Sequence, residues 1–258
     1  MKDFGRKIKS LAIALVLLLI CWQLLAMALD KVFFPGPLAS FKAFASELTG
    51  GSLFKHSLIS FYRVTLSMII SFALALPAGI YIGRNKKADR ILTPITYILY
   101  PIPKVVFLPV IVVLFGLGDF PKIFLIVLVL FFQLLVVVRD SAKSVEDEYI
   151  FSARALGMRN GMILKHIVLP LCVPAAITSL RVGVGTAIAI LFFSETFASL
   201  SGVGYYISDM MSRRNYDNMF AGIIAMSLIG LALYAVLYII EDVMTSWQED
   251  SHRAREME

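Results

Sequence analysis

Few side chains in this sequence have the types and spacing that catalysis or metal binding requires. The three histidines, His56, His166 and His252, are far from one another, and none has a partner at catalytic spacing. Cys21 and Cys172 are also far apart, so no zinc-ligand or redox pattern can be built from them. No G-x4-G-K-[ST] phosphate-binding loop occurs in the chain. The sequence therefore predicts no enzyme and no metal or cofactor site on this chain.

Lys104 is a candidate for contact with a solute, because it lies in the middle of a long apolar run. An ionisable side chain deep in a membrane is costly and marks a functional site by default. A cationic wall at this place would suit an anionic substrate. The other interpretation is structural: the amino group snorkels to the surface, or pairs with a carbonyl that Pro101 or Pro103 leaves free.

Three further side chains in or near apolar runs are candidates for the solute pathway: Arg181, Ser194 and Glu195. Arg181 can instead pair with lipid headgroups or helix ends. Arg63 and Glu195 both lie near the predicted outer ends of two different runs. We expect an ion pair between them that fixes these two helices together. If it forms, reversing both charges is expected to restore activity that either single reversal abolishes.

The composition places these residues in a membrane protein. Of the 258 residues, 59% are hydrophobic and 16% are charged, and the mean hydropathy is +0.82. Soluble domains carry about 25% charged and about 45–50% apolar residues. The net charge of +6 fits Lys and Arg on cytoplasmic segments better than nucleic-acid binding. We therefore expect an all-α polytopic membrane protein in contact with lipid.

Six segments are apolar and long enough to cross a membrane, which takes about 20 residues in a helix. The first also resembles a cleavable signal peptide, but it exceeds the usual apolar core of about 7–15 residues, so we expect a retained helix. The third contains four prolines, which bend or break helices, and we expect it to lie in the interior. The predicted spans are residues 11–29, 58–83, 91–117, 122–138, 171–193 and 219–240.

The segments between the spans indicate the topology. Residues 38–48 repeat apolar positions at helical spacing, which predicts a short amphipathic helix at the membrane surface. Most Lys and Arg residues lie before the first span, after the second and after the fourth, so the positive-inside rule places both termini in the cytoplasm. We interpret residues 1–258 as one transmembrane domain with a cytoplasmic loop at residues 139–170 and a charged, soluble tail from Glu241.

This loop contains the longest polar stretch between apolar segments, residues 151–170. Its first part is rich in Ala and Leu, which predicts a short helix that Gly157 can end. Leu156 and Met158 can supply apolar contacts at its tip, and Arg154 can bond a carboxylate of a partner. Because the chain has no phosphate-binding loop, any ATP hydrolysis that drives it must occur on another polypeptide.

The same stretch resembles the E-A-A-x3-G-x9-I-x-L-P motif of permease subunits of bacterial binding-protein-dependent ABC importers. The spacing from Gly157 to Ile167 and Pro170 matches, whereas Phe151 stands where the motif has Glu. Glu148, about one turn earlier, is the alternative. Motifs that resemble the nitrate, sulfonate and taurine class of these permeases follow the same order along the chain: Ser57-Leu58, Arg63-Val64, Pro101-Ile102-Pro103, Leu108-Pro109, Phe115-Gly116-Leu117-Gly118, Leu180-Arg181-Val182-Gly183, Ser194-Glu195 and Gly202-Val203-Gly204.

The resemblance implies a type I importer permease fold in the bacterial inner membrane. It implies two permease subunits, with a second copy of this chain as the expected partner, two ATPase subunits that hold ATP and Mg²⁺, and an external solute-binding protein. It also implies alternating access for a small solute such as a sulfonate, nitrate or a vitamin precursor. The loop helix would couple the ATPase to the spans through Ser152, Ala153, Arg154, Ala155, Leu156, Gly157 and Met158.

The competing function is a self-sufficient channel or an ion-coupled secondary transporter. Such a protein needs carboxylates or unwound helix pairs near the membrane midplane. The predicted spans hold no acidic residue at depth and show no inverted repeat. The sequence therefore favours the ATP-driven importer over this alternative, and it does not name the substrate.

Overall fold

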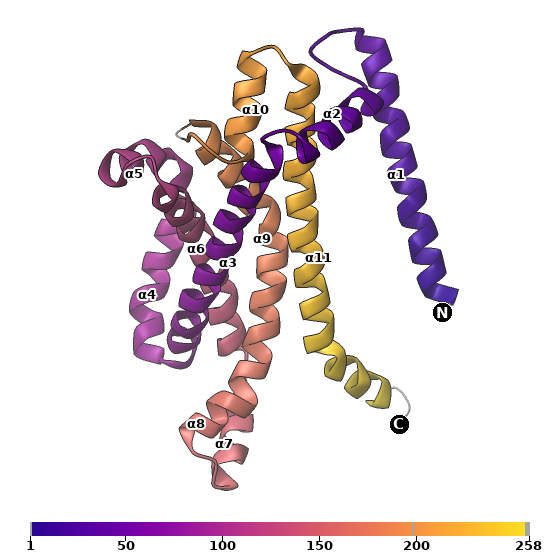
Figure 1. The fold of residues 1–258 in the computed structure, drawn as a ribbon. Helices are drawn as coiled ribbons and strands as arrows, with labels where there is room; N and C mark the ends of the chain where they lie inside the picture. The colour runs from indigo at the N-terminus through magenta and orange to yellow at the C-terminus, as the bar shows by residue number, and fades with distance from the viewer. Residues whose placement is uncertain (1, 198, 256–258) are drawn as a thin grey trace.

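The computed structural model describes residues 2–197 and 199–255, and every regular element in these ranges is a helix (Figure 1). The prediction of an all-α protein is confirmed. Two of the elements are not α-helices, since η1 is a 3-10 helix and η2 is a π-helix. The elements are α1 (Lys2–Leu29), α2 (Pro37–Thr49), α3 (Leu53–Arg84), α4 (Lys86–Leu99), η1 (Lys104–Phe107), α5 (Leu108–Phe115), α6 (Asp119–Lys143), α7 (Asp147–Ala155), α8 (Asn160–Ile163), η2 (Leu164–Val168), α9 (Leu169–Phe197), α10 (Val203–Ser212) and α11 (Tyr216–Arg255).

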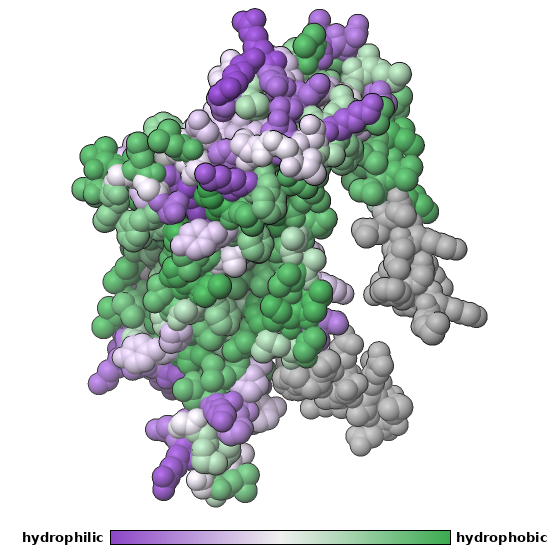
Figure 2. Space-filling view, in the orientation of Figure 1, coloured by the Kyte–Doolittle hydropathy of each residue, from purple (hydrophilic) through white to green (hydrophobic). Residues whose placement is uncertain are grey.

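Four helical segments of the described chain are long and apolar enough to cross a membrane: Leu53–Arg84, Asp119–Lys143, Asn160–Phe197 and Tyr216–Met244. The bent pair formed by α4 and the η1–α5 segment makes a fifth if it is counted as one span. Ile13–Leu29 of α1 is a shorter apolar helix. Figure 2 shows hydrophobic side chains over the middle of the bundle and hydrophilic ones gathered towards its two ends, as a lipid-embedded protein requires.

Helices α3 and α6 pack closely against each other, because α3 presents small residues to α6. A Cβ atom on Gly79 would lie 2.7 Å from the side chain of Val138, and one on Gly83 would lie 2.5 Å from the carbonyl oxygen of Arg139. Such small-residue contacts let two helix backbones approach in a membrane, where little hydrophobic force drives them together. The same row of buried small residues on α3 includes Ser60, Ser67, Ser71 and Ala75.

Helix α9 packs against both α6 and α3 and completes the core of the bundle (Figure 1). The Gln133 side-chain amide on α6 donates a hydrogen bond to the carbonyl oxygen of Ser179 at 3.2 Å. A Cβ atom on Gly183 would lie 3.1 Å from Leu130, so this glycine also faces α6. Gly183 therefore serves helix packing within the chain.

The third predicted span is broken where its prolines cluster. Helix α4 ends at Leu99, Pro101 and Pro103 lie in the break, and the two helical parts meet at an angle of 77°. The expected bend is confirmed. The expected interior position is wrong for the single chain, because α4 and α5 lie at its edge and side chains such as Val106 and Val113 are exposed. Prolines here mark a change of direction, since each removes a backbone donor wherever the segment lies.

Two other elements differ from a simple bundle. Helix α1 stands apart from α9 and α11 along most of its length in Figure 1, and aromatic contacts hold it near its outer end. The Trp22 indole stacks on Phe220 of α11 with ring centroids 5.8 Å apart, and its N–H donates to the carbonyl of Pro35 at 3.1 Å. Helix α11 does not end at Glu241, where we predicted that a charged tail begins. It continues to Arg255, and Glu241 still bonds to α9.

Candidate functional site

The predicted loop helix is α7, and Gly157 ends it by a specific backbone motif. The amide of Gly157 donates to the carbonyl of Arg154 at 2.9 Å, and the amide of Met158 donates to the carbonyl of Ala153 at 3.0 Å. This pair of bonds is the Schellman motif, which needs a left-handed residue at its centre. Gly157 has φ +81°, and a Cβ atom there would meet nothing within 4 Å. Glycine is therefore required for its backbone conformation and not for space.

The tip of this loop presents apolar side chains to the surroundings. Leu156 is 84% exposed and Phe151 is 68% exposed, whereas Ile150 and Ala153 are buried against the rest of the chain. Glu148, the alternative to the missing motif Glu, is also exposed. Both positions are therefore accessible to a partner. A firmly anchored helix with an exposed apolar tip suits docking of a second protein.

The loop joins α9 through a π-helical turn, η2, which ends two residues before Pro170. A proline removes the amide that would bond the fourth residue before it and crowds that residue's carbonyl. A wider turn relieves this crowding, because π-turns space donor and acceptor one residue further apart. Residues 160–197 thus form one long helical segment that is irregular only near its inner end, where Pro174 also lies.

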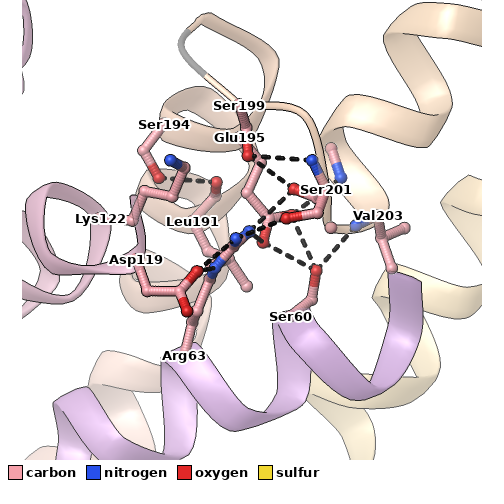
Figure 3. Close-up of polar contacts among 12 residues, drawn as sticks. Ser60, Arg63, Asp119, Lys122, Leu191, Ser194, Glu195, Ser199, Ser201 and Val203 are labelled. Carbon is pink, nitrogen blue, oxygen red and sulfur yellow. Dashed lines mark hydrogen bonds and ion pairs between the residues drawn. The ribbon is translucent and has the colours of Figure 1, made fainter. Parts of the chain in front are cut away.

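A second polar constellation lies at the opposite end of the bundle, where α3 meets α9 (Figure 3). Arg63 and Glu195 form the ion pair expected from the sequence, with Nη1 and Oε1 2.7 Å apart. The Arg63 side chain is 2% exposed and that of Glu195 is fully buried. Ser60 donates to the same carboxylate at 2.8 Å, and so does the amide of Gly204 at 2.9 Å. The carboxylate is therefore held by three donors, two from α3 and one from the start of α10.

Two glycines make room for this carboxylate. A Cβ atom on Gly202 would lie 2.2 Å from the Glu195 carboxyl group, and one on Gly204 would lie 2.7 Å from the Glu195 Cβ. Gly202 also has φ +102°, which disfavours any other residue. The amide of Val203 between them donates to the Ser60 hydroxyl at 2.7 Å. The segment Gly202-Val203-Gly204 is thus shaped around Glu195.

Arg63 binds a second acidic residue and a loop. Its Nε and Nη2 donate to the half-exposed Asp119 carboxylate at 2.8 and 2.6 Å, and its guanidinium also donates to the carbonyl and hydroxyl of Ser201, both at 2.8 Å. Lys122 lies beside this cluster in Figure 3 and is fully buried. Its amino group donates to the carbonyls of Leu117 and Gly118, each at 2.8 Å. Arg63 therefore ties α3 to the start of α6 and to α9, whereas Lys122 fixes the turn before α6 to α6 itself.

Lys104 has its hydrogen bonds satisfied at the break after α4. Its amino group donates to the carbonyls of Leu99, Tyr100 and Ile102 at 2.9, 3.0 and 3.4 Å, and the side chain is 8% exposed. The amino group also lies 4.8 Å from the centroid of the Phe132 ring. A cation suits the carbonyl end of a helix. This geometry favours the structural interpretation, and contact with a solute stays a prediction.

Arg181 is paired across two helices. Its Nε lies 2.6 Å from a Glu241 carboxylate oxygen, and its Nη1 donates to the Tyr234 hydroxyl at 2.7 Å. Thr178, one turn earlier on α9, donates to the other Glu241 oxygen at 2.7 Å. The guanidinium also faces the Tyr238 ring at 5.9 Å. The expected structural pairing therefore exists, but its partner is α11 and not a lipid headgroup or a helix end.

The structure does not bring the predicted pathway residues together. Ser194 and Glu195 share the outer cluster, where the Ser194 hydroxyl donates to its own helix at Leu191, whereas Lys104 and Arg181 each have separate partners. Sequence reasoning missed Asp119, which belongs to the outer cluster. It took Lys122 only as the first residue of the fourth predicted span and gave it no role. The signal that could have found it is a lysine four and five residues after the residues of a Gly-containing turn, because its amino group can reach back to their carbonyls.

Comparison with known proteins agrees with this architecture. Residues 75–248 match the family described as binding-protein-dependent transport system inner membrane component. The chain is 28% identical to the taurine transport system permease protein TauC of Escherichia coli (strain K12), over 92% of this chain and 89% of the relative. It is also 28% identical to the putative aliphatic sulfonates transport permease protein SsuC of Bacillus subtilis (strain 168), over 96% and 91%.

Among solved structures, a chain of a bacterial ABC transporter involved in the import of the acidic polysaccharide alginate superposes with a TM-score of 0.65. The match covers 95% of this chain and 98% of that chain at 17% sequence identity. An identity this low shows the shared fold alone. It supports the arrangement of the helices described above and carries nothing about the solute.

Proposed function

We propose a coupling route and a substrate class for this chain, which belongs to the family of inner membrane components of binding-protein-dependent transport systems. It is the permease subunit of an ABC importer, a multi-pass protein of the inner membrane that does not itself catalyse a reaction. An importer of this family works with ATPase and solute-binding partners. The permease provides the route through the membrane.

The coupling route runs through α7. The observation that carries it is the Schellman motif at Gly157, which holds an apolar tip at Leu156 on a buried base at Ala153. A lever must be stiff to bias a two-state equilibrium. In this proposal residues 152–158, at the end of α7, enter a groove of one ATPase subunit. Closure of the ATPase dimer then moves α7, so that the spans open outward. Phe151 supplies an apolar contact where the family motif has Glu.

The remaining features of the proposal follow the type I importer arrangement. The chain crosses the membrane six times, with α1 as the first span and α4–α5 as the bent third span, and both termini lie in the cytoplasm. Two copies of this chain pair with two ATPase subunits, which hold ATP and Mg²⁺, and with one external solute-binding protein. The support for this orientation is the positive-inside rule, because most Lys and Arg residues lie on the segments predicted to be on the α7 side.

The substrate class we propose is a small sulfonate. Its support is that two relatives aligned over nearly the whole chain are named for taurine and for aliphatic sulfonates. The runner-up is a vitamin precursor, since a further relative at 22% identity is named a formylaminopyrimidine transport permease. Lys104 and Arg181 remain the cationic candidates for contact with a sulfonate, although each already has partners within the chain.

One experiment tests the substrate and another tests the coupling route. The substrate test measures ATP-dependent uptake of labelled taurine and of formylaminopyrimidine by proteoliposomes that hold the permease, its ATPase and its solute-binding protein. Uptake of the sulfonate alone supports the proposal, and uptake of the pyrimidine alone refutes the substrate class. Uptake without ATP or without the ATPase would instead favour a self-sufficient channel or an ion-coupled transporter.

The coupling test replaces the exposed tip residue Leu156 by Asp. The matched control is Leu200→Asp, which makes the same change at a 78% exposed leucine near the opposite end of the bundle. We expect Leu156→Asp to lose the ATPase on purification and Leu200→Asp to retain it, with both variants inserted normally. Equal retention by both variants would contradict docking at α7.

A further inference from the structure

A groove of about 580 Å³ opens between the inner end of α3 and the segment α7–η2. Ligand pockets commonly enclose about 300–1,000 Å³, so the groove is large enough for part of a lipid or a small molecule. It lies at the end of a helix long enough to cross a membrane, and its rim includes Arg84 in the last turn of that helix. The groove is therefore at the boundary between the predicted lipid core and the cytoplasm.

The wall of this groove is apolar and open to the outside. It is lined by Leu76, Pro77 and Ile80 of α3 and by Leu164 and Val168 of the π-helix η2. Tyr81, also in the lining, is 60% exposed and Leu164 is 41% exposed. A tyrosine at a membrane interface commonly sits at the level of the headgroups. Asn85 and Asn160 also line the groove, and its apolar part can hold an acyl chain.

The mouth of the groove carries positive charge. The Arg84 guanidinium is fixed in place, because it donates to the carbonyls of Val145 and Ala142 at 3.0 and 3.3 Å, and it is 3.6 Å from the mostly exposed Asp147 carboxylate. In the described part of the chain, the Arg154 side chain lines the groove with no hydrogen-bond or ion-pair partner. At the mouth, Arg154 therefore has no counter-ion, and it lies beside Arg84, which is anchored.

Helix α7 separates this groove from its exposed tip. Ile150 and Arg154, which line the groove, are four residues apart and therefore share one face of the helix. Phe151 and Leu156 do not line the groove and are exposed. The groove and the exposed apolar tip proposed for the ATPase are consequently different faces of one short helix. Of the segment 152–158 proposed for the ATPase contact, Arg154 lines the groove, so both faces could be occupied together only if the ATPase contacts the others.

We propose that this groove binds an anionic phospholipid of the cytoplasmic leaflet, with an acyl chain along Leu76, Ile80 and Leu164 and its phosphate at Arg84 and Arg154. The reason is the match of chemistry: an apolar wall meets a cationic mouth at the depth where a headgroup joins its chains. Basic pockets at the cytoplasmic ends of membrane helices bind anionic headgroups for the same reason. The lipid would bridge α3 and the loop, and so would support α7 from the membrane side.

The main experiment uses a tryptophan placed in the groove as a reporter. Tyr81→Trp is made in a chain whose two natural tryptophans, Trp22 and Trp247, are replaced by Phe, and the full complex with its ATPase is reconstituted in vesicles. Brominated phosphatidylglycerol is then compared with brominated phosphatidylcholine as quencher, at equal mole fraction. Ile91→Trp is the position control, because Ile91 is exposed, lies near the same basic segment and does not line the groove.

We expect phosphatidylglycerol to quench the tryptophan at position 81 more strongly than phosphatidylcholine, with no such difference at position 91. Arg154→Gln is expected to lower the preference for phosphatidylglycerol about fivefold, the factor for one basic side chain at an anionic surface. Arg159→Gln removes the same charge five residues later, outside the groove lining, and is expected to leave the preference unchanged.

Three results would overturn the proposal. The first is equal quenching of position 81 by both lipids, and the second is the same phosphatidylglycerol preference at positions 81 and 91. The third is that adding the ATPase shields position 81 from both lipids, which would make the groove part of the protein interface. If the tryptophan variants do not assemble, native mass spectrometry of the unlabelled complex replaces them. Arg154→Gln should then lose co-purified anionic phospholipid that Arg159→Gln retains, and equal lipid in both would refute the site.

Discussion

Glu195→Gln is the change that best separates a structural from a transport role at the outer end of the bundle. The substitution keeps the shape of the side chain but removes its charge. Arg63, 2.7 Å away and 2% exposed, would then lose its buried counter-ion. The hydroxyl of Ser60 and the amide of Gly204 would still find an oxygen acceptor, so the loss is confined to the ion pair.

The size of the effect follows from burial. Removing one partner of a buried ion pair costs about 3–5 kcal/mol when the other charge is left without compensation, and Arg63 keeps the half-exposed Asp119, so the lower end of this range applies. Asp119 provides the matched comparison, since it bonds the same guanidinium at 2.6 Å but is half exposed. An exposed ion pair contributes only about 0–1 kcal/mol. We therefore expect Glu195→Gln to lower the free energy of unfolding by several kcal/mol and Asp119→Asn by about 1 kcal/mol or less.

The assay is denaturant unfolding of the two purified variants in the same detergent, together with uptake kinetics in proteoliposomes. A structural role predicts a large stability difference between the variants and an unchanged KM in the molecules that remain folded. Contact of Glu195 with the solute predicts the reverse: a raised KM with little change in stability. Equal destabilisation by Glu195→Gln and Asp119→Asn, or none by either, would refute the reasoning from burial.

The structure also changes the expectation for a charge swap. Exchanging Arg63 and Glu195 would place a guanidinium against the amide of Gly204 and into the space that Gly202 leaves for a carboxylate. It would also place a carboxylate opposite Asp119 and the carbonyl of Ser201. The double reversal is therefore expected to fail to restore activity, in contrast to the expectation from the sequence.

The remaining predictions concern one substitution each. Gly157→Ala should cost about 1–2 kcal/mol of local strain because φ is +81°, and should raise the ATP hydrolysed per solute imported; Gly161→Ala, at a glycine without a positive φ, should not. Lys104→Met should lower the thermal midpoint, because a buried acceptor left unbonded costs about 1–3 kcal/mol, and a raised KM at unchanged midpoint would instead make Lys104 a solute contact. Arg181→Met should lower the midpoint more than Arg181→Lys, which keeps a charge opposite Glu241; equal shifts would argue against the ion pair.

Much of the helical architecture could be predicted from the sequence, because apolar length and prolines act locally. The pairing of Arg63 with Glu195 was predictable as well, since two opposite charges at the same membrane boundary have few other partners. The further bonds of this pair were not, because they depend on how residues 199–204 fold back over α9. The same limit applies to Glu241, whose charge indicates a tail, whereas its position about seven turns along α11 places it opposite Arg181.

The polar contacts at the two ends of α9 explain how a movement of the loop could reach the outer end. Residues 160–197 form one helical segment, which at 1.5 Å per residue is about 57 Å long. Its irregular turns, η2, Pro170 and Pro174, all lie near the loop, whereas its outer end is fixed by Glu195 to Arg63. A displacement of α7 can therefore have two outcomes. It can be absorbed by bending near the loop, or the straight part of α9 after Pro174 can transmit it to the cluster around Glu195. Because Arg181 joins α9 to Glu241 of α11, transmission along α9 would move α9 and α11 together.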